Sequence, residues 1–224
     1  MVHHSTYLDM PPAWLGKRFL DGAERLKSAN PPLYEHEYLG VPNGTTGSVF
    51  ENLSLRTISD DEIAAAAAPP LAGVDFGYWP DAWAWNRMAY DPDAGRLLIF
   101  DELTLYKKSN RETFYAILAR GVLPREVIYC DSAEPKSISD YRGWGLRARG
   151  AIKGPGSLAY SMRWLQGLSQ IAIDPARCPD TAREFAAYEY SSDPGAPYPD
   201  RNDHHIAAVR YGTEPYRRRA AMDD

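Results

Sequence analysis

The feature that most restricts the fold of this chain is the spacing of its apolar residues from residue 71 onward, which is first that of strands and then alternates between that of helices and that of strands. Three apolar runs come first, at 71–77, 82–90 and 97–106, and the turn-forming residues 91–95 between the last two predict a hairpin. After them, segments with helical spacing alternate with short apolar runs. This succession predicts an α/β domain with a mixed central sheet flanked by helices.

The remaining predicted elements of this domain are short. Helices are expected at 110–120, 134–142, 157–168, 180–190 and 200–212, and further strands at 127–130, 148–152 and 170–173. Three strands in sequence followed by alternating helices and strands are typical of an RNase H-like fold. The sequence therefore predicts the α/β class with that topology.

The first seventy residues have a different character. They are divided by turn-forming breakers at 11–12, 31–32 and 42–44. Between the breakers, 13–28 has helical spacing, and a short helix through the alanines 64–68 is expected to end at Pro69. We therefore predict two parts, a connector or arm over residues 1–70 and the α/β domain over residues 71–224.

Composition and charge exclude several classes of protein. No run reaches the roughly eighteen apolar residues that cross a bilayer, and the start lacks the apolar stretch of a secretory signal. The two cysteines, Cys130 and Cys178, form no metal-ligand pattern, which predicts ordinary buried thiols in a reducing cytoplasm. A net charge of −5 argues against non-specific DNA binding as the main activity. It does not exclude a nuclease, because an acidic metal site repels DNA until cations fill it.

Two aspartates follow apolar strands. Asp75 ends the first strand, between Gly73 and Gly77, and Asp131 follows the strand 127–130. A carboxylate at the end of a buried strand is costly unless it binds a partner, and the glycines would let a bulky ligand approach the backbone. Neighbouring strand ends gather such side chains into one site. The alternative for each aspartate is a cap of a turn or helix.

A third group of candidate ligands lies in the segment 200–211. Asp203 and His204 precede Ala207 by four and three residues, so a helix would bring all three near one face. Imidazole with carboxylate suits Mn²⁺, and carboxylates with water suit Mg²⁺. The alternative is an exposed helix start with two solvated histidines. Together with the two strand-end aspartates, this group fits phosphodiester hydrolysis by two divalent cations.

Basic residues follow the second aspartate along the chain. We expect three of them, Lys136, Arg149 and Lys153, to contact the DNA backbone. Lys153 begins the loop 153–157, which can offer an ammonium and free amides to a phosphate ahead of a helix.

An aromatic run covers residues 78–85. Trp83 and Trp85 alternate within a predicted strand and are expected to share a buried face. Tyr78 and Trp79 lie closer to Asp75 and are candidates for stacking on a base.

Several motifs, in order, resemble those of one family, the nuclease domain of large terminase subunits of tailed bacteriophages of the PBSX-like type. They are 73–77, 131–137, 153–157 and the closing segment around His204, and stretches at 5–9 and 38–50 resemble the family's connector. The resemblance implies a metal-dependent endonuclease that cuts concatemeric viral DNA at the start and end of packaging.

The resemblance also implies the site and the partners. By motif position Asp75, Asp131 and His204 would be the catalytic metal ligands, with two Mg²⁺ or Mn²⁺ ions as cofactors. The substrate would be double-stranded DNA in the cytoplasm of the bacterial host. A terminase ATPase domain, a small terminase subunit and the portal would be partners. The chain itself contains no nucleotide-binding P-loop motif.

Two positions depart from the family pattern. Asp203 stands where the family has asparagine, and Ala207 stands where it has an aspartate. The missing acid would weaken one metal site, and Asp203 could supply a carboxylate in its place. Two interpretations stay open: an active endonuclease with Asp203 as a further ligand, and a weakened or inactive packaging module of the same fold. Other RNase H-like enzymes, such as a Holliday-junction resolvase or a transposase, would differ in product.

Overall fold

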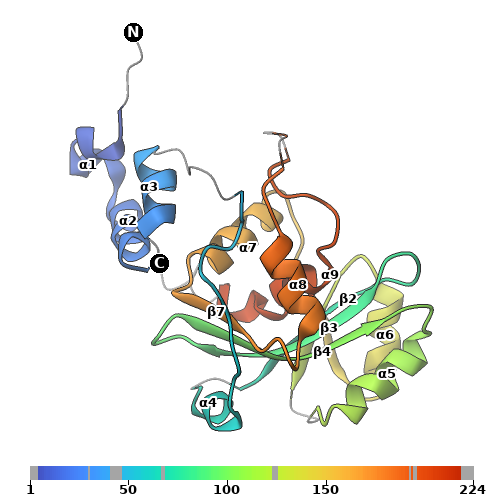
Figure 1. The fold of residues 1–224 in the computed structure, drawn as a ribbon. Coiled ribbons are helices and arrows are strands. Elements are labelled where there is room, and N and C mark those ends of the chain that lie inside the picture. The colour runs from blue at the N-terminus through green and yellow to red at the C-terminus, as the bar shows by residue number, and fades with distance from the viewer. Residues whose placement is uncertain are drawn as a thin grey trace.

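A seven-stranded mixed sheet forms the centre of the computed structural model (Figure 1). The structure describes residues 5–29, 31–40, 47–66, 69–122, 126–191, 193 and 196–217. Neighbouring strands follow the order β1-β7-β4-β3-β2-β5-β6. The predicted α/β class with a helix-flanked mixed sheet is confirmed.

The strands are β1 (Leu53–Leu55), β2 (Leu71–Asp75), β3 (Trp83–Asp91), β4 (Arg96–Leu105), β5 (Val127–Cys130), β6 (Arg147–Gly150) and β7 (Gln170–Ile173). β2, β3 and β4 pair antiparallel, and the turn after Asp91 joins β3 to β4 as predicted. β5 and β6 extend the sheet beside β2, and β7 and β1 extend it beside β4, all in parallel.

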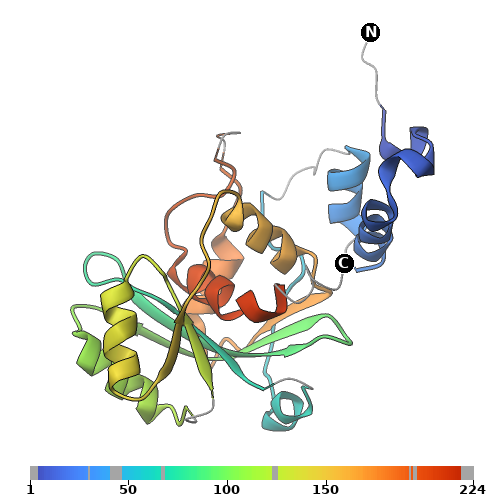
Figure 2. The same cartoon turned by 180° about the vertical axis from the view of Figure 1, so that it is seen from behind.

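Helices cover both faces of the sheet (Figures 1 and 2). One face carries α5 (Asn110–Ala119) and α6 (Pro135–Gly143), and the other carries α7 (Ser157–Gln166), α8 (Pro179–Ala187) and α9 (His204–Gly212). Trp83 and Trp85 are both buried in the cluster under α5 and α6, which confirms their predicted shared face. Cys130 and Cys178 are buried free thiols, also as predicted. No helix in the described part of the chain has the length and apolar character to cross a membrane.

The alternation of side chains along β2 determines which face receives its polar end. Ala72 and Val74 belong to the core under α5 and α6, whereas Leu71 belongs to the core under α7, α8 and α9. Since side chains alternate along a strand, Asp75 projects toward α9. The same alternation applies to β5, where Ile128 and Cys130 face α5 and α6. Asp131, the next residue, therefore faces the α9 side as well.

The two glycines beside Asp75 serve the chain's own backbone, and the interpretation that they make room for a ligand is wrong. A Cβ on Gly73 would lie 1.8 Å from the carbonyl oxygen of Ala208 in α9, and one on Gly77 would lie 2.2 Å from that of Ala82. Gly73 thus lets α9 lie directly against β2. Gly77 closes the base of the β2–β3 loop.

The N-terminal helices lie outside the sheet on the side of α7, where Arg163 approaches Glu37 to 3.8 Å (Figures 1 and 2). They are a short 3₁₀ turn (Tyr7–Asp9), α1 (Pro12–Leu15), α2 (Lys17–Ala29) and α3 (Pro31–Leu39). The predicted helix at 13–28 is divided at Gly16, whose φ of 75° ends α1. The sequence does not predict α3 because its prolines suggest a breaker, yet proline fits the first turn of a helix.

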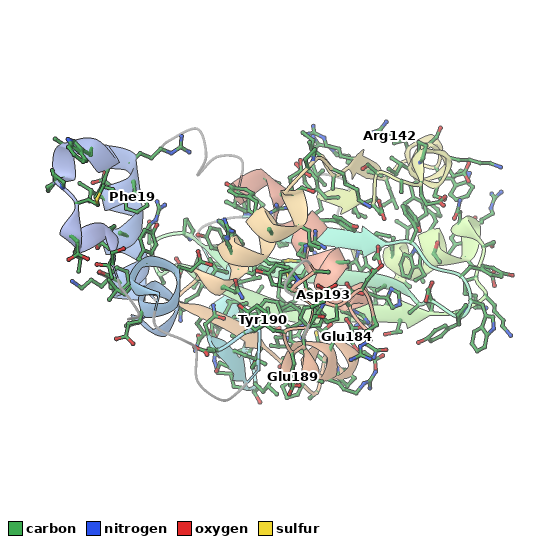
Figure 3. The ribbon with its side chains drawn as sticks, turned by 90° about the horizontal axis from the view of Figure 1, so that it is seen from above. Phe19, Arg142, Glu184, Glu189, Tyr190 and Asp193 are labelled. Atoms are coloured by element: carbon green, nitrogen blue, oxygen red, sulfur yellow. The ribbon has the colours of Figure 1, made fainter. Side chains whose placement is uncertain are left out.

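Aromatic rings hold this arm together. Tyr7, Phe19, Tyr34 and Tyr38 pack against one another with ring centroids 5.3–6.4 Å apart. Viewed from above, Phe19 in the arm and Arg142 in α6 lie on opposite sides of the molecule (Figure 3).

Part of the predicted connector belongs to the sheet and its cores. Val49, Phe50 and Ile58 are buried in the clusters on the two faces, β1 pairs with β7, and α4 (Asp60–Ala65) packs Ile63 against the sheet. A three-residue strand has too little periodicity to be recognised in the sequence. The domain therefore draws one edge from residues before 71, although the sequence predicts its boundary at 70.

Candidate active site

Asp75 and Asp131 leave the ends of two adjacent parallel strands. Val74 is paired with Cys130, and the Asp131 amide donates to the Val74 carbonyl oxygen at 3.0 Å. Burial raises the pKa of Asp75, and the negative charge of Asp131 adds to this effect, while the hydrogen bond from His204 opposes it. The structure therefore brings together the two aspartates that the sequence singled out.

His204 approaches them from α9, on the face of the sheet toward which Asp75 points. It is the first residue of α9, and its Nδ1 lies 3.1 Å from Oδ2 of Asp75. Its Nε2 lies 3.8 Å from the carboxylate of Asp81, at the end of the β2–β3 loop. The contact with Asp75 raises the pKa of His204 above its ordinary value, although burial lowers it.

Lys153 contacts the second aspartate. Its Nζ lies 2.5 Å from Oδ1 of Asp131 and 5.3 Å from the ring centroid of Tyr211 in α9. The Asp131 carboxylate also accepts a hydrogen bond from the Ala133 amide at 2.8 Å and one from the Tyr211 hydroxyl at 3.4 Å. Asp131 therefore caps the turn before α6 and at the same time faces the site.

Asp203 lies just outside the helix that was expected to contain it. The predicted helix 200–212 begins at His204, because Asn202 has a left-handed φ of 50° and Asp203 is the N-cap residue. The Asp203 side chain makes no capping hydrogen bond, and burial, followed by the charges of Asp200 and Asp75, raises its pKa. Ala207 is buried against Ala151 and Tyr211. Asp203 therefore lies one helical turn before Ala207, whose amide donates to the Asp203 carbonyl oxygen at 2.7 Å, and it lines a cavity beside His204.

The structure places the other two predicted DNA contacts on α6 and β6. Lys136 is exposed in the first turn of α6, and Arg149 is exposed on β6, where it pairs with Tyr129 of β5. Of the three cations, Lys153 is the one for which the structure gives an ion pair with a site carboxylate.

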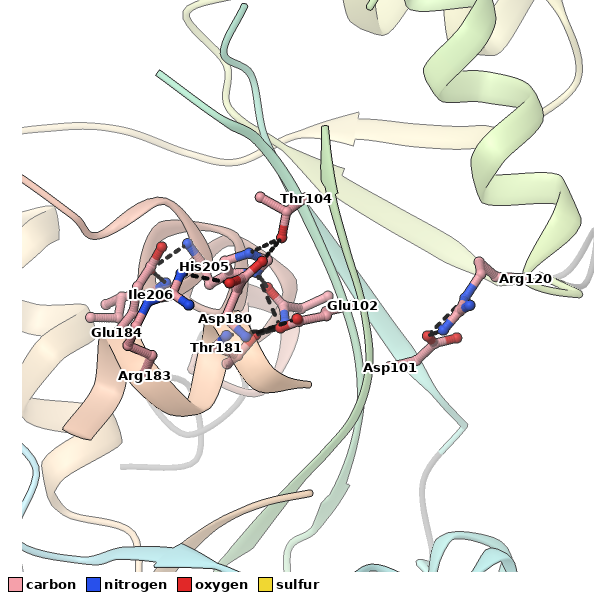
Figure 4. A network of polar contacts seen from close by, with 11 residues as sticks. Asp101, Glu102, Thr104, Arg120, Asp180, Thr181, Arg183, Glu184, His205 and Ile206 are labelled. Carbon is pink, nitrogen blue, oxygen red and sulfur yellow. Dashed lines mark hydrogen bonds and ion pairs between the residues drawn. The ribbon is translucent and has the colours of Figure 1, made fainter. Parts of the chain in front are cut away.

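Glu184 in α8 was not recognised from the sequence. Its Oε2 accepts hydrogen bonds from the amides of His205 at 2.8 Å and Ile206 at 3.3 Å, and so holds the first turn of α9 that carries His204 (Figure 4). Burial raises its pKa to about 7. It lines a cavity of about 1120 Å³ next to His204, together with Asp81, Asp180, Asp200 and Asp203. A single glutamate in an amphipathic helix carries no sequence signal of this role.

His205 is a buried anchor, so the interpretation of two solvated histidines is wrong. Its ring nitrogens lie 2.9 Å from the Asn86 side chain in β3 and 2.9 Å from the Thr104 hydroxyl in β4. In the same network the Glu102 carboxylate in β4 accepts hydrogen bonds from the Asp180 amide and the Thr181 hydroxyl in α8 (Figure 4). The Thr104 hydroxyl in turn donates to the Asp180 carboxylate. These contacts fix α8 and α9 on the sheet and thereby position His204.

The donors fit a divalent cation in kind. Two carboxylates and an imidazole are ligands that Mn²⁺ accepts, and carboxylates suit Mg²⁺. Among the described residues, the ion-pair partner of the Asp75 carboxylate is His204, whereas Lys153 neutralises Asp131. Within the same residues, no three His, Cys, Asp or Glu side chains are grouped closely enough to hold a metal ion. A cation at Asp131 would therefore compete with the Lys153 ammonium for this carboxylate.

Comparison with known proteins identifies the family of the chain. The family model for the terminase RNase H-like domain matches residues 75–214, from the first aspartate to two residues beyond α9. The chain belongs to the terminase RNase H-like family. The expected resemblance and the RNase H-like fold are confirmed.

Two curated relatives cover nearly the whole chain. The large terminase subunit of Bacillus phage SPP1 is 40% identical over 95% of the chain, and the PBSX phage terminase large subunit of Bacillus subtilis (strain 168) is 30% identical over 96%. The chain spans 51% and 50% of these relatives, about half of their length.

Solved structures of terminases share the fold. The nuclease domain of the SPP1 large terminase with bound Mn is 36% identical, with a TM-score of 0.68 over 75% of this chain and 98% of that domain. The large terminase of a thermophilic bacteriophage, at 14% identity, has a TM-score of 0.61 over 88% of this chain and 51% of its own. The chain thus has the RNase H-like fold of the terminase family and resembles the SPP1 nuclease domain over most of that domain's length.

Proposed function

We propose that this chain is a metal-dependent DNA endonuclease that cuts concatemeric viral DNA during packaging. One observation supports this most directly: the strand-end aspartates Asp75 and Asp131 lie side by side, and His204 reaches Asp75 at 3.1 Å from α9. The Mn in the related SPP1 nuclease domain supports a divalent cation in this chain as well.

Asp75, Asp131 and His204 would hold the cations, with Asp203 as a further ligand. When bound, two divalent cations activate the attacking water and stabilise the leaving oxygen of a phosphodiester. The chain's own residues prepare the site: Glu184 holds the first turn of α9 in place, and Lys153 offers an ammonium to a phosphate once it leaves Asp131. Lys136 in α6 and Arg149 in β6 would contact the DNA backbone.

The substrate and partners are part of the proposal. Double-stranded DNA would be cut in the cytoplasm of the bacterial host, and the chain would work with a terminase ATPase domain, a small terminase subunit and the portal. The relatives are large terminase subunits about twice as long as this chain, which is consistent with a motor domain elsewhere in such proteins.

Incubation of the purified chain with supercoiled plasmid tests the activity. Cutting to nicked and linear forms is expected in Mn²⁺ or Mg²⁺ and is expected to stop in EDTA. Absence of cutting in both cations, from protein with a native circular dichroism spectrum, would reject the proposal.

The alternative, a weakened packaging module, rests on Ala207. This residue lies in an apolar contact with Ala151 and Tyr211, close to the Asp131 carboxylate that Tyr211 contacts. If Asp203 replaces the missing acid, Asp203→Ala should lower the cutting rate by at least about ten-fold, and Ala207→Asp should restore part of it. The plasmid cutting rates of Asp203→Ala, Ala207→Asp and the variant with both changes show whether Asp203 replaces the missing acid. An unchanged rate in Asp203→Ala would remove Asp203 from the ligand set.

Lys153 and a cation compete for Asp131. Lys153→Gln removes the ammonium, so Mn²⁺ affinity measured by calorimetry should increase by about three- to ten-fold, in line with a partly exposed ion pair. Lys108→Gln is the matched control, because this similarly exposed lysine pairs with Glu112 away from the site. Equal Mn²⁺ affinity in wild type and Lys153→Gln would show that the ion pair does not oppose metal binding.

A further inference from the structure

The loop between β2 and β3 carries exposed aromatic rings. Tyr78 and Trp79 are each 61% exposed, and Tyr106, which follows β4, is 47% exposed. The rings of Trp79 and Tyr106 meet edge to face, with centroids 6.0 Å apart. We call Tyr78, Trp79, Tyr106 and Lys107 the aromatic tip. Exposed rings gathered in this way are typical of a binding surface.

The aromatic tip is held in its exposed position by its own backbone. The Lys107 amide donates to the Tyr78 carbonyl oxygen at 2.8 Å, which joins the two segments. At the base of the loop, Gly77 lies so close to the backbone of Ala82 that no side chain would fit. The backbone that carries the rings is therefore restrained, so little backbone entropy remains to be lost on binding.

A positive charge lies on the same surface. The Lys107 Nζ is 4.3 Å from the ring centroid of Trp79, and the ion pairs found in the described part of the chain do not include Lys107. The remaining ring contact of Trp79 among those residues is the edge contact with Tyr106. The indole thus lies beside a cation, and because Trp79 is 61% exposed, part of its ring is accessible to a planar ligand.

The aromatic tip borders the candidate active site at both ends of its loop. The loop begins directly after Asp75, and it returns at Asp81, whose carboxylate lies 3.8 Å from Nε2 of His204. The loop that carries the rings therefore starts and ends at the candidate site.

We propose that the aromatic tip binds the DNA strand next to the cut phosphate, with Trp79 stacked on an unpaired base and Lys107 at a backbone phosphate. Every base has a face on which an aromatic ring can stack, so this contact needs no particular sequence. An ammonium beside the ring suits the phosphate of the same strand. These two features favour single-stranded or locally opened DNA over a protein partner. The inference rests on the proposed nuclease function and names where its substrate strand is held.

Fluorescence anisotropy of DNA binding tests this contact without any cutting. The probe is a fluorescein-labelled single strand of about 30 nucleotides, longer than a typical binding site, in EDTA. All proteins are the 224-residue chain carrying Asp75→Asn, alone or with one further substitution. Trp79→Ala should weaken binding by about ten-fold or more, and Lys107→Gln should weaken it less and reduce its dependence on salt.

Two further variants make the result specific. Trp79→Phe keeps a ring and should restore most of the affinity, whereas Tyr115→Ala removes a ring that is 55% exposed on α5 and should change nothing. Quenching of tryptophan fluorescence by the unlabelled strand should be smaller in Trp79→Phe than in the Asp75→Asn chain.

The contrary results are equally clear. Unchanged affinity in Trp79→Ala overturns the inference and leaves a protein as the occupant of the aromatic tip, and a loss that Trp79→Phe does not restore overturns stacking. Because the assay contains no metal, these failures are distinct from a failure of the plasmid assay, which would reject the proposed nuclease.

Discussion

Asp75→Asn is expected to lower metal-dependent plasmid cutting by at least about 100-fold. Asparagine has the same shape as aspartate and can still accept a hydrogen bond from His204, so the fold should be kept. It removes the negative charge that the end of β2 presents to α9. Without that charge a divalent cation loses a ligand, and Mn²⁺ binding measured by calorimetry should weaken together with cutting.

Asp91→Asn is the matched control. Asp91 also ends a strand, but at the far end of β3, where it contacts Arg96 and the Ala94 amide. This variant should cut plasmid at the wild-type rate. If Asp75→Asn cuts as well as Asp91→Asn does, the metal-binding role of Asp75 is wrong.

Gly73→Ala is expected to destabilise the domain by about 3 kcal/mol or more. The added methyl would lie 1.8 Å from the Ala208 carbonyl oxygen and 2.8 Å from the Gly212 nitrogen, and both atoms belong to the backbone of α9. Backbone atoms cannot rotate away as a side chain can, so α9 must move off β2. Since α9 carries His204, cutting should fall together with stability.

Gly143→Ala provides the comparison for this change. Gly143 ends α6 with no atom within 4 Å of the added Cβ, so alanine should leave stability unchanged or raise it by up to about 1 kcal/mol. Urea unfolding followed by circular dichroism measures both variants. A wild-type midpoint for Gly73→Ala would contradict the close packing of α9 on β2.

Local sequence pattern predicted the elements and the faces of the strands. The strands 127–130 and 170–173 have the bounds expected from their apolar runs, and the alternation of 83 and 85 placed both tryptophans in one core. The same period of two fixes the side of the sheet to which Asp75 points. These features depend on residues a few positions apart, which is why they can be recognised in a single sequence.

Only the tertiary structure decided which side chains meet. His204 and Asp75 are 129 residues apart, and their contact depends on Gly73 allowing α9 to approach β2. The burial of His205 rather than His204 depends on where α9 begins and on partners in β3 and β4. Neither the cap that Glu184 provides nor the ion pair between Lys153 and Asp131 has a local pattern. Periodicity encodes an element and its face, whereas these contacts come from the packing of elements that are distant in the chain.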